Sequence, residues 1–463
     1  MDKSQSVEIN RPLILGVLIF GAFVTVLNQT LMLVAIPPIM RDFDISAAQA
    51  QWVTTAFMLT NGIFIPVSAA LIDRYSSRYL YLTAITLFLL GTALGAIAQT
   101  FPQLLTARII QGMAAGIAMP LAQTVIMSLF PPHRRGTAMG LVGLVIAFAP
   151  AIGPTLSGWL IDQLSWRYLF IVLLPFVVLG LIAAWWVMAD VTEYRDSRID
   201  PLSVSLSTLG WGGLLYGFSM AGTVGWNQPS VIGALLIGVV ALSLFIPQQL
   251  RMDKPMLEFR VFQAPMYRLT TGISIIVFTL LIGPQTLLPI YVQNARGFGA
   301  LQTGLLLLPG AVVMGLMSPI AGRLFDRFGI RWLAIGGLLL MCIGLGHFVT
   351  LGPETPLSRI TVGFILHMLG ISTLMMSLIT AGINASPPHL IAHATAMNNT
   401  LRMVGASIGT AVLVSIMSAR TATLADLPTE LALIGGLRTA FVTALCLALA
   451  GLVLAFRLRD QPS

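Results

Sequence analysis

The sequence GLVGLVIAFAPAIGPTLSGW at residues 140–159 decides how the rest of the chain is interpreted. It is apolar and rich in residues with small side chains, which allow helices to approach closely in a membrane. It also contains Pro150 and Pro154, and prolines inside a membrane helix are tolerated where neighbouring helices or a cavity satisfy the freed carbonyls. We therefore expect a helix that packs tightly within a bundle and bends there. Close packing alone explains the small residues, whereas the two prolines favour a transport site, because broken helices mark such sites in carriers.

The composition identifies a membrane protein. The chain has 463 residues, of which 57% are hydrophobic and 9% are charged, against about 25% charged in soluble domains. We find fourteen apolar runs of about 20 residues, the length that crosses a bilayer as a helix. The first run is too long and too polar inside for a cleaved signal peptide. Cys342 and Cys446 lie in different runs, so a disulfide has no support.

The basic residues define an orientation. If the runs alternate in direction, Lys and Arg on the side of the N-terminus outnumber those on the other side by about three to one. Cytoplasmic loops carry this excess. We therefore expect a multi-pass protein of the bacterial cytoplasmic (inner) membrane with both termini in the cytoplasm. The sequence has no basic run with interleaved aromatic residues, so we expect no nucleic acid partner. The net charge of +8 reflects the membrane topology instead.

A motif that occurs twice on the cytoplasmic side indicates two halves. Eight runs separate its copies where two six-helix halves would leave six, so the seventh and eighth runs are an insertion. We predict an all-α membrane protein with a six-helix bundle at residues 12–189, a linker with two membrane helices at 190–267, and a second six-helix bundle at 268–457. The two copies have Asp followed by Arg one and five residues later: Asp73, Arg74 and Arg78, then Asp326, Arg327 and Arg331.

Several stretches in register resemble one family. The chain looks like the major facilitator superfamily, in particular its fourteen-span drug:proton antiporter branch, over essentially its whole length. The family's loop motif resembles Ala69, Asp73, Arg74, Ser76 and Arg78, and more closely Gly322, Asp326, Arg327, Gly329 and Arg331. Its R-x-x-Q-G motif resembles Arg108, Gln111, Gly112 and Gly116, and the start of the second run, Gln51 and Trp52, also looks like this branch. Its antiporter motif resembles the stretch quoted above through Gly140, Pro150, Gly153, Pro154 and Gly158.

The charged residues of these motifs are candidates for gating and proton coupling. Asp73 and Asp326, with the arginines that follow them, are expected to form cytoplasmic gates, in which each acid pairs with an arginine and lies near a helix terminus in one conformation and loses those contacts in the other. Arg108 lies about five residues inside its run, where a guanidinium is functional or paired unless it reaches the outer interface. The resemblance implies that it takes part in proton coupling. For Arg402 we favour reach to the cytoplasmic interface, with gating as the alternative.

No Asp or Glu lies well inside any of the fourteen runs. Proton-coupled carriers usually rely on such a carboxylate, and Asn28, which cannot titrate, stands where the resemblance implies an aspartate. His367, about 11 Å inside the twelfth run, titrates near neutrality and is one candidate for proton coupling. A hydrogen-bonded interhelical histidine is the alternative, and Asp73 is the other candidate.

Sparse polar groups among adaptable apolar ones are typical of a substrate cavity. The candidates are Asn28, Gln29, Asn61, Gln111, Met113, Gln123, Gln285, Met375, Asn384, Asn398 and Asn399.

We expect a secondary exporter of amphiphilic drugs or toxic compounds that works by alternating access and proton antiport. Its partners are a small amphiphilic molecule, protons and the lipid bilayer, it needs no metal or cofactor, and a monomer is the simplest expectation. Only Lys3 and Lys254 occur, and neither follows a glycine, so a P-loop is excluded. A facilitator or uptake carrier for a neutral solute or lipid-like metabolite is the alternative. No nucleophile constellation supports an enzyme.

Overall fold

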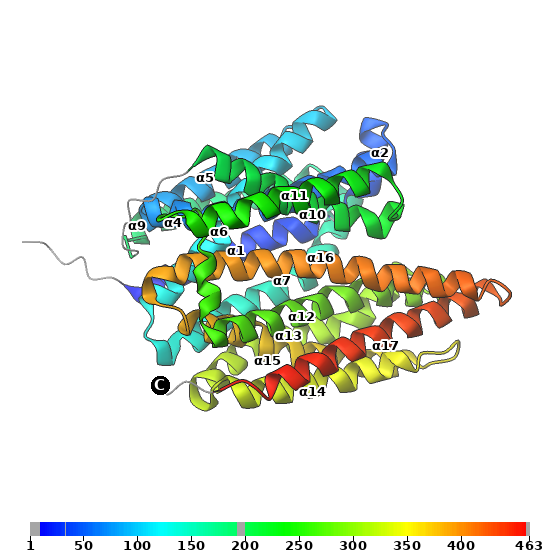
Figure 1. The fold of residues 1–463 in the computed structure, drawn as a ribbon. Coiled ribbons are helices and arrows are strands. Elements are labelled where there is room, and N and C mark those ends of the chain that lie inside the picture. The colour runs from blue at the N-terminus through cyan, green and yellow to red at the C-terminus, as the bar shows by residue number, and fades with distance from the viewer. Residues whose placement is uncertain (1–9, 33, 192–199, 460–463) are drawn as a thin grey trace, which may run out of the picture.

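The computed structural model describes residues 10–32, 34–191 and 200–459, and this part of the chain is helical without a β-strand. The long helices run side by side in one elongated bundle (Figure 1). They are α1 (Arg11–Leu31), α4 (Trp52–Arg74), α5 (Ser77–Ala96), α6 (Phe101–Leu129), α7 (Arg135–Gln163), α9 (Leu173–Val187), α10 (Pro201–Val224), α11 (Pro229–Arg251), α12 (Pro265–Pro289), α13 (Ala300–Phe328), α14 (Ile330–Val349), α15 (Leu357–Asn384), α16 (Ile391–Thr423) and α17 (Thr429–Ala455). Short helices connect them: α2 (Ile36–Phe43), α3 (Ala47–Ala50), η1 (Pro132–Arg134), α8 (Tyr168–Ile171), η2 (Phe259–Gln263), the π-helix η3 (Ile290–Ala295) and η4 (Pro388–Leu390).

Thirteen helices within the described ranges are long and apolar enough to cross a membrane. The expected all-α membrane fold is therefore confirmed. The 24-residue helix α10 is not among the thirteen, since its serines and glycines dilute its apolar residues. The count of fourteen crossings thus stays a prediction.

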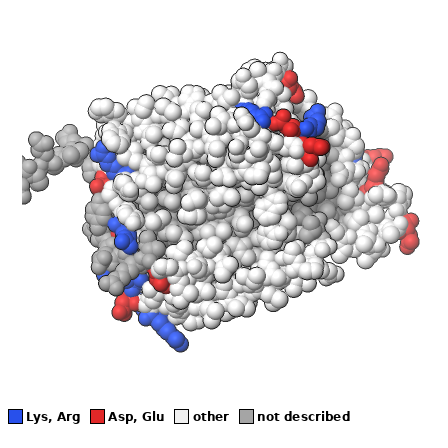
Figure 2. Space-filling model, turned by 90° about the horizontal axis from the view of Figure 1, so that it is seen from above, with Lys and Arg blue, Asp and Glu red and all other residues white. Residues whose placement is uncertain are grey.

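The surface agrees with a protein that lies in a bilayer. Figure 2 shows charged side chains at the two ends of the molecule and a broad uncharged band between them. Large apolar side chains in the middle of the long helices are exposed, such as Leu179 of α9 at 59% and Leu236 of α11 at 61%. Exposed apolar surface of this extent is stable in lipid and unfavourable in water.

The helices form two groups joined along one seam. Helices α1, α4, α5, α6, α7 and α9 pack on one another, and so do α12 to α17. The seam is made by α7 against α13 and by α16 against α4 and α6. Helices α10 and α11 pair with each other, and α10 also packs on α4 and α16.

Glycines bring paired helices together where a side chain would not fit. A Cβ atom on Gly213 of α10 would lie 2.7 Å from the carbonyl oxygen of Ala234 on α11. One on Gly344 of α14 would lie 2.7 Å from the carbonyl oxygen of Gly363 on α15. This is the small-residue packing expected of membrane helices, which gain contact area without a hydrophobic driving force between them.

Local chemistry sets several helix ends. Ser76 caps α5 by accepting a hydrogen bond from the Tyr79 N–H, and Asp200 caps α10 by accepting one from the Ser203 N–H. Hydrogen bonds from the Ser203 hydroxyl and N–H also lower the pKa of Asp200 below its ordinary value. Gly329 ends α13 with a φ of 75°, which other residues rarely adopt. The two copies of the loop motif therefore differ at this position, because Ser76 caps a helix where Gly329 turns the chain.

The first and last described residues, Asn10 and Arg459, lie at the same end of the bundle (Figure 1). We call this the terminal end. Because successive long helices alternate in direction, α4 and α13 finish at the terminal end, and α7 and α16 begin there.

Candidate functional site

The stretch at residues 140–159 forms most of α7, which packs against α1 and α13. A Cβ atom on Gly140 would lie 2.7 Å from the carbonyl oxygen of Ser318 on α13. A Cβ atom on Gly153 would lie 2.3 Å from Oγ1 of Thr30 on α1. The small residues thus bring α7 against both neighbours, and this places one helix of the first group on the seam.

The remaining motif residues of α7 are less constrained. The helix is continuous from Arg135 to Gln163, so the prolines do not end it. Pro150 is exposed, and a Cβ atom on Gly158 would have no neighbour within 4 Å. The side chain of Pro154 lies outside the described residues.

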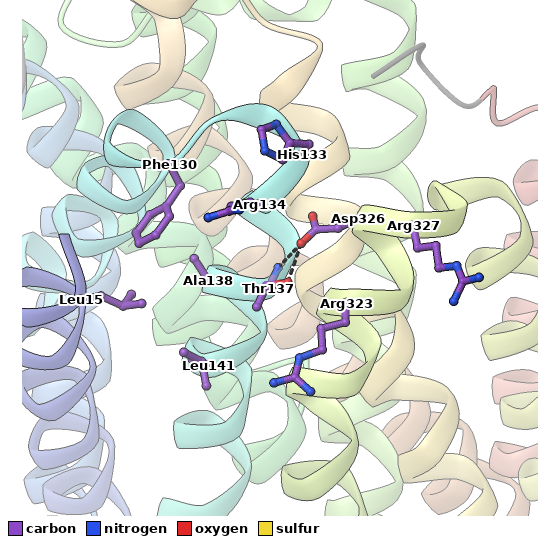
Figure 3. Close-up of a pocket in the computed structure, with 10 residues that line it drawn as sticks. All are labelled: Leu15, Phe130, His133, Arg134, Thr137, Ala138, Leu141, Arg323, Asp326 and Arg327. Atoms are coloured by element: carbon purple, nitrogen blue, oxygen red, sulfur yellow. Dashed lines mark hydrogen bonds between the residues drawn. The ribbon is translucent and has the colours of Figure 1, made fainter.

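Asp326 of α13 holds the start of α7. Its carboxylate accepts hydrogen bonds from the Gly136 N–H at 2.8 Å, the Thr137 N–H at 2.7 Å and the Thr137 hydroxyl at 2.6 Å. Figure 3 shows the acid pointing from α13 toward Thr137. The first N–H groups of a helix have no partner within it and carry partial positive charge, so a carboxylate is the complementary group. This contact joins the two groups of helices at the terminal end.

Asp73 of α4, in the first group of helices, makes the corresponding contact to α16 of the second group. Its Oδ2 lies 2.9 Å from Nε2 of His393 near the start of α16, and the two side chains are 12% and 5% exposed respectively. The N–H of Glu258 donates to Nδ1 of His393 at 3.2 Å, so Nδ1 is unprotonated and Nε2 carries the hydrogen that Asp73 accepts. The arrangement fixes the tautomer of His393 between two protein groups.

His393 was not predicted from the sequence, although a signal for it exists. The sequence PPHRRGTAM at residues 131–139 has a counterpart in PPHLIAHATAM at residues 387–397. These segments lead into α7 and α16, the two helices whose starts receive the acids from the opposite group. Matching the second segment to the first would have marked the start of α16 as the partner of Asp73.

Two further polar contacts cross the seam. Arg135 of α7 donates to Oδ1 of Asn384 at the end of α15 at 2.6 Å. Asn399 of α16 donates to Oε1 of Gln123 on α6 at 2.7 Å. With the two acids, these contacts close the terminal end of the seam.

A cleft of about 510 Å³ adjoins the Asp326 contact. Its walls come from α1, from the connection before α7, from α7 itself and from α13 (Figure 3). The lining residues are Leu15, Phe130, His133, Arg134, Thr137, Ala138, Leu141, Arg323, Asp326 and Arg327. The Asp326 contact therefore lies beside open space between the two groups of helices.

The predicted arginine partners of the two acids are absent among the described residues, because backbone N–H groups, a hydroxyl and a histidine take their places. Arg78 donates instead to the carbonyl oxygen of Trp185 within its own group. Arg74, Arg327 and Arg331 are exposed and lie beside Tyr75, Phe328 and Trp332 respectively.

Arg108 is fully buried and bound on several sides. It donates to the carbonyl oxygen of Val53 at 3.0 Å, to Oδ1 of Asn28 at 2.5 Å and to Oε1 of Gln111 at 2.8 Å. Its guanidinium also lies 4.3 Å from the centre of the Phe57 ring. Arg108 is thus a paired interior residue and does not reach the outer interface. Asn28 accepts from it at the position where the resemblance implied an acid.

From the sequence we expected the Arg402 side chain to extend to the cytoplasmic interface, but the structure buries it. It is 5% exposed, with its guanidinium 4.4 Å from the centre of the Phe278 ring. The reason is that α16 begins at Ile391 and not near residue 396, which places Arg402 about 16 Å from the helix start. Met375 lines the same small space.

His367 is an interhelical hydrogen-bonding residue. It is fully buried, and its Nε2 lies 2.9 Å from the carbonyl oxygen of Leu280 on α12. Because a carbonyl oxygen only accepts, Nε2 carries the hydrogen. Its Nδ1 has no partner among the described residues. The structure separates His367 from the seam contacts.

The other candidate cavity residues differ in burial. Asn398 is buried and donates to Thr271. Gln29, Asn61 and Met113 are half-buried, whereas Gln285 is exposed. Asn384 belongs to the seam contact at the terminal end, and its role in substrate binding stays a prediction.

Known proteins with similar sequence or structure agree with this architecture. The family model described as Major Facilitator Superfamily matches residues 18–410. The uncharacterized MFS-type transporter YcnB of Bacillus subtilis is 55% identical over 450 residues, covering 97% of this chain and 95% of that protein. Lincomycin resistance protein LmrB of Bacillus subtilis is 40% identical over 457 residues, covering 96% and 95%. The crystal structure of the human organic anion transporter MFSD10 superposes with a TM-score of 0.70 at 16% identity, covering 96% of this chain and 99% of that chain, which shows a shared fold.

Proposed function

This chain belongs to the Major Facilitator Superfamily, and from that premise we propose that it is a secondary exporter of amphiphilic drugs or similar toxic compounds. A carrier of this kind works by alternating access, in which two helix bundles rock about a central site. The named relative LmrB, a lincomycin resistance protein, supports export as the direction of transport.

The observation that carries the proposal is the closed seam at the terminal end. Asp326 holds the start of α7 and Asp73 holds the start of α16, each from the opposite group. A hydrogen bond to a charged group contributes about 1.5–3 kcal/mol, so these contacts are strong enough to bias a two-state equilibrium and weak enough to break in each cycle. They fit a gate that opens when the bundles rock apart.

We propose that the terminal end faces the cytoplasm, as the distribution of Lys and Arg predicts. The seam then closes the cytoplasmic side, and this conformation is one in which the central site has no access to the cytoplasm. We further propose fourteen crossings, with α10 and α11 inserted between an N-terminal bundle at residues 12–189 and a C-terminal bundle at residues 268–457. The packing of α10 on both α4 and α16 supports a place between the bundles.

We propose protons as the driving ion and the Asp73 and His393 pair as the group that couples them. In the closed seam one hydrogen lies between Nε2 and the carboxylate, and the Glu258 N–H occupies the other ring nitrogen. Opening would break this hydrogen bond and expose both side chains to water, with which a proton can be exchanged. A conformational cycle that takes up a proton on one side of the membrane and releases it on the other is driven by a proton gradient.

Arg108 and Asn28 are proposed to take a different part in coupling. Their hydrogen bond connects α6 with α1, and Gln111 extends the network to Thr92 of α5. Because the cluster holds a buried charge through neutral acceptors, we propose that it transmits movement between these helices without itself exchanging a proton. Gln123 and Asn399, whose contact crosses the seam, are the candidates that we propose for contact with substrate.

Everted membrane vesicles from cells without their own exporters test the proposal. We expect addition of a drug to stimulate proton movement in vesicles that contain the wild-type protein. Asp73→Asn should abolish this response while the protein remains folded. Asp162→Asn is the matched control, because Asp162 is an exposed acid at the far end of α7. Full transport by Asp73→Asn would contradict the gate, and drug transport that persists without a proton gradient would contradict the coupling.

The alternative is a facilitator or uptake carrier for a neutral solute. The observation in its favour is that no Asp or Glu lies in the middle of the described spans. Transport measured in reconstituted vesicles with and without an imposed proton gradient separates the two. A facilitator equilibrates its substrate in both cases, whereas an antiporter accumulates it only with the gradient.

A further inference from the structure

A small interior space at Arg402 is distinct from the seam contacts. It is lined by Ser274, Val277, Phe278 and Leu281 of α12, Ile371 and Met375 of α15, and Arg402 of α16. Its empty volume is about 200 Å³ and is too narrow for a water molecule in this conformation. A ligand would therefore enter when the three helices move, as they do in alternating access.

Arg402 has no acceptor in this space. No carboxylate, carbonyl or hydroxyl among the described residues accepts a hydrogen bond from its guanidinium, whose only specific neighbour is the Phe278 ring. The hydroxyl of Ser274, 3% exposed, also has no partner in the described part of the chain. An unpaired buried charge and an unpaired buried hydroxyl both cost stability, so their coincidence at one space calls for a ligand that satisfies both.

Arg108 provides the internal comparison. It is a second buried arginine in the membrane interior, and protein oxygens from three residues accept its hydrogen bonds. Chains that bury an arginine for structure supply it with acceptors in this way. Arg402 is buried to a similar degree and has none. Nη2 of Arg108 also has no partner among the described residues, but its Nε and Nη1 are satisfied by protein oxygens, whereas the guanidinium of Arg402 makes no hydrogen bond to the described residues and only faces the Phe278 ring.

We propose that Arg402 and Ser274 bind the carboxylate of an amphiphilic organic acid, whose apolar body lies against Phe278, Leu281 and Met375. A guanidinium binds a carboxylate through two parallel hydrogen bonds, and a single negative charge neutralises it. The apolar walls match the rest of such a molecule. This inference rests on the proposed export function and adds the class of substrate to it.

The test compares three radiolabelled compounds with one apolar body and different charge: 2-naphthoate, 2-naphthamide and (2-naphthyl)trimethylammonium. Uptake into proteoliposomes that contain the full chain is measured at pH 8, where the carboxylate is ionised. We expect wild-type protein to transport naphthoate with a KM at least about tenfold below that of naphthamide, in line with a charge-assisted bidentate contact.

Variants locate the effect. Arg402→Gln should raise the KM for naphthoate by about tenfold or more, in line with loss of the charge-assisted contact, and change that for naphthamide by less than about threefold. Arg402→Lys, which retains the charge without the planar fork, should recover part of the difference. Ser274→Ala should raise the KM for naphthoate to a smaller extent. Arg420→Gln is the matched control, because this exposed arginine carries the same charge and lies near the end of α16. Size-exclusion profiles establish that each variant is folded.

Three results would overturn the inference. Equal KM values for naphthoate and naphthamide in the wild-type protein would remove the acid preference, while transport of the other two compounds would leave the proposed export function standing. Equal slowing of all three compounds in Arg402→Gln would assign Arg402 to the conformational cycle. If Arg402 and Arg420 variants behave alike, the preference arises from the general charge of the protein.

Discussion

Asp326→Asn is the sharpest test of the closed seam. The substitution keeps the size of the side chain and removes the charge that faces the start of α7. The amide has one oxygen, so it can accept at the Gly136 side or at the Thr137 side and not at both. Each hydrogen bond that the amide retains is no longer made to a charged oxygen, which costs about 1 kcal/mol per bond. At least one N–H donor on the other side is left without its acceptor. Because Asp326 is half-buried, water replaces part of this loss, and we expect about 2–3 kcal/mol.

A change of that size should shift the ratio of closed to open molecules by about 30- to 150-fold, since 1.4 kcal/mol corresponds to a factor of ten. The assay is a distance distribution between spin labels at Tyr79 and Trp332, which are 60% and 67% exposed at the starts of α5 and α14. Cys342 and Cys446 are first replaced by serine, because they are free thiols. The closed distance should dominate in the parent protein, and Asp326→Asn should add a longer one.

Asp162→Asn in the same labelled protein is the control and should leave the distribution unchanged. A distribution that Asp326→Asn does not alter would refute the reasoning. It would mean that packing of α7 against α13, and not the acid, holds the seam closed.

Three further outcomes are expected. Gly136→Ala should open the seam and reduce export, because the new Cβ atom would lie 2.4 Å from Oδ1 of Asp326; Gly158→Ala, which meets nothing within 4 Å, should transport normally in the same assay. His393→Gln should flatten the dependence of transport on pH, and a pH profile identical to that of the parent protein would assign the titrating role elsewhere. Asn28→Leu should lower the free energy of unfolding by about 2–4 kcal/mol, since it removes an acceptor from a buried charge; this is measured as a reduced melting temperature in detergent, with Asn28→Asp expected to retain stability.

The sequence was enough to predict the all-helical membrane fold, because each membrane helix is recognised from its own apolar run. Apolar runs of spanning length and the two copies of the Asp and Arg motif predict the helices and the symmetry without knowledge of any contact. Arg108 was predictable for a similar reason, since a charge inside an apolar run must find partners. Helix α10, in which serines and glycines are spread among the apolar residues, is the one whose crossing stays a prediction.

The partners of the two acids could not be predicted in the same way. Asp326 binds backbone N–H groups, which every residue has, so no side-chain pattern announces them. His393 precedes the apolar run that the sequence shows at residues 396–418, whereas α16 already begins at Ile391, five residues before that run. The same shift in the helix start explains why Arg402 was expected at the interface and lies in the interior.

The two acids are related by the repeat, yet their chemistry differs. Asp326 accepts from groups that hold their hydrogens at every physiological pH, so its contact depends only on its own charge and on the position of α7. Asp73 accepts from Nε2 of a histidine whose Nδ1 accepts from the Glu258 N–H, so a proton added to Nδ1 would break the Glu258 contact. The proposed gate therefore combines one contact made to hydrogens of α7 that do not exchange with the acid and one contact made through a histidine ring that can gain a proton. If protons drive this carrier, the asymmetry predicts that replacement of His393 removes coupling while Asp326 still closes the seam, and that replacement of Asp326 loosens the seam while the pH response remains.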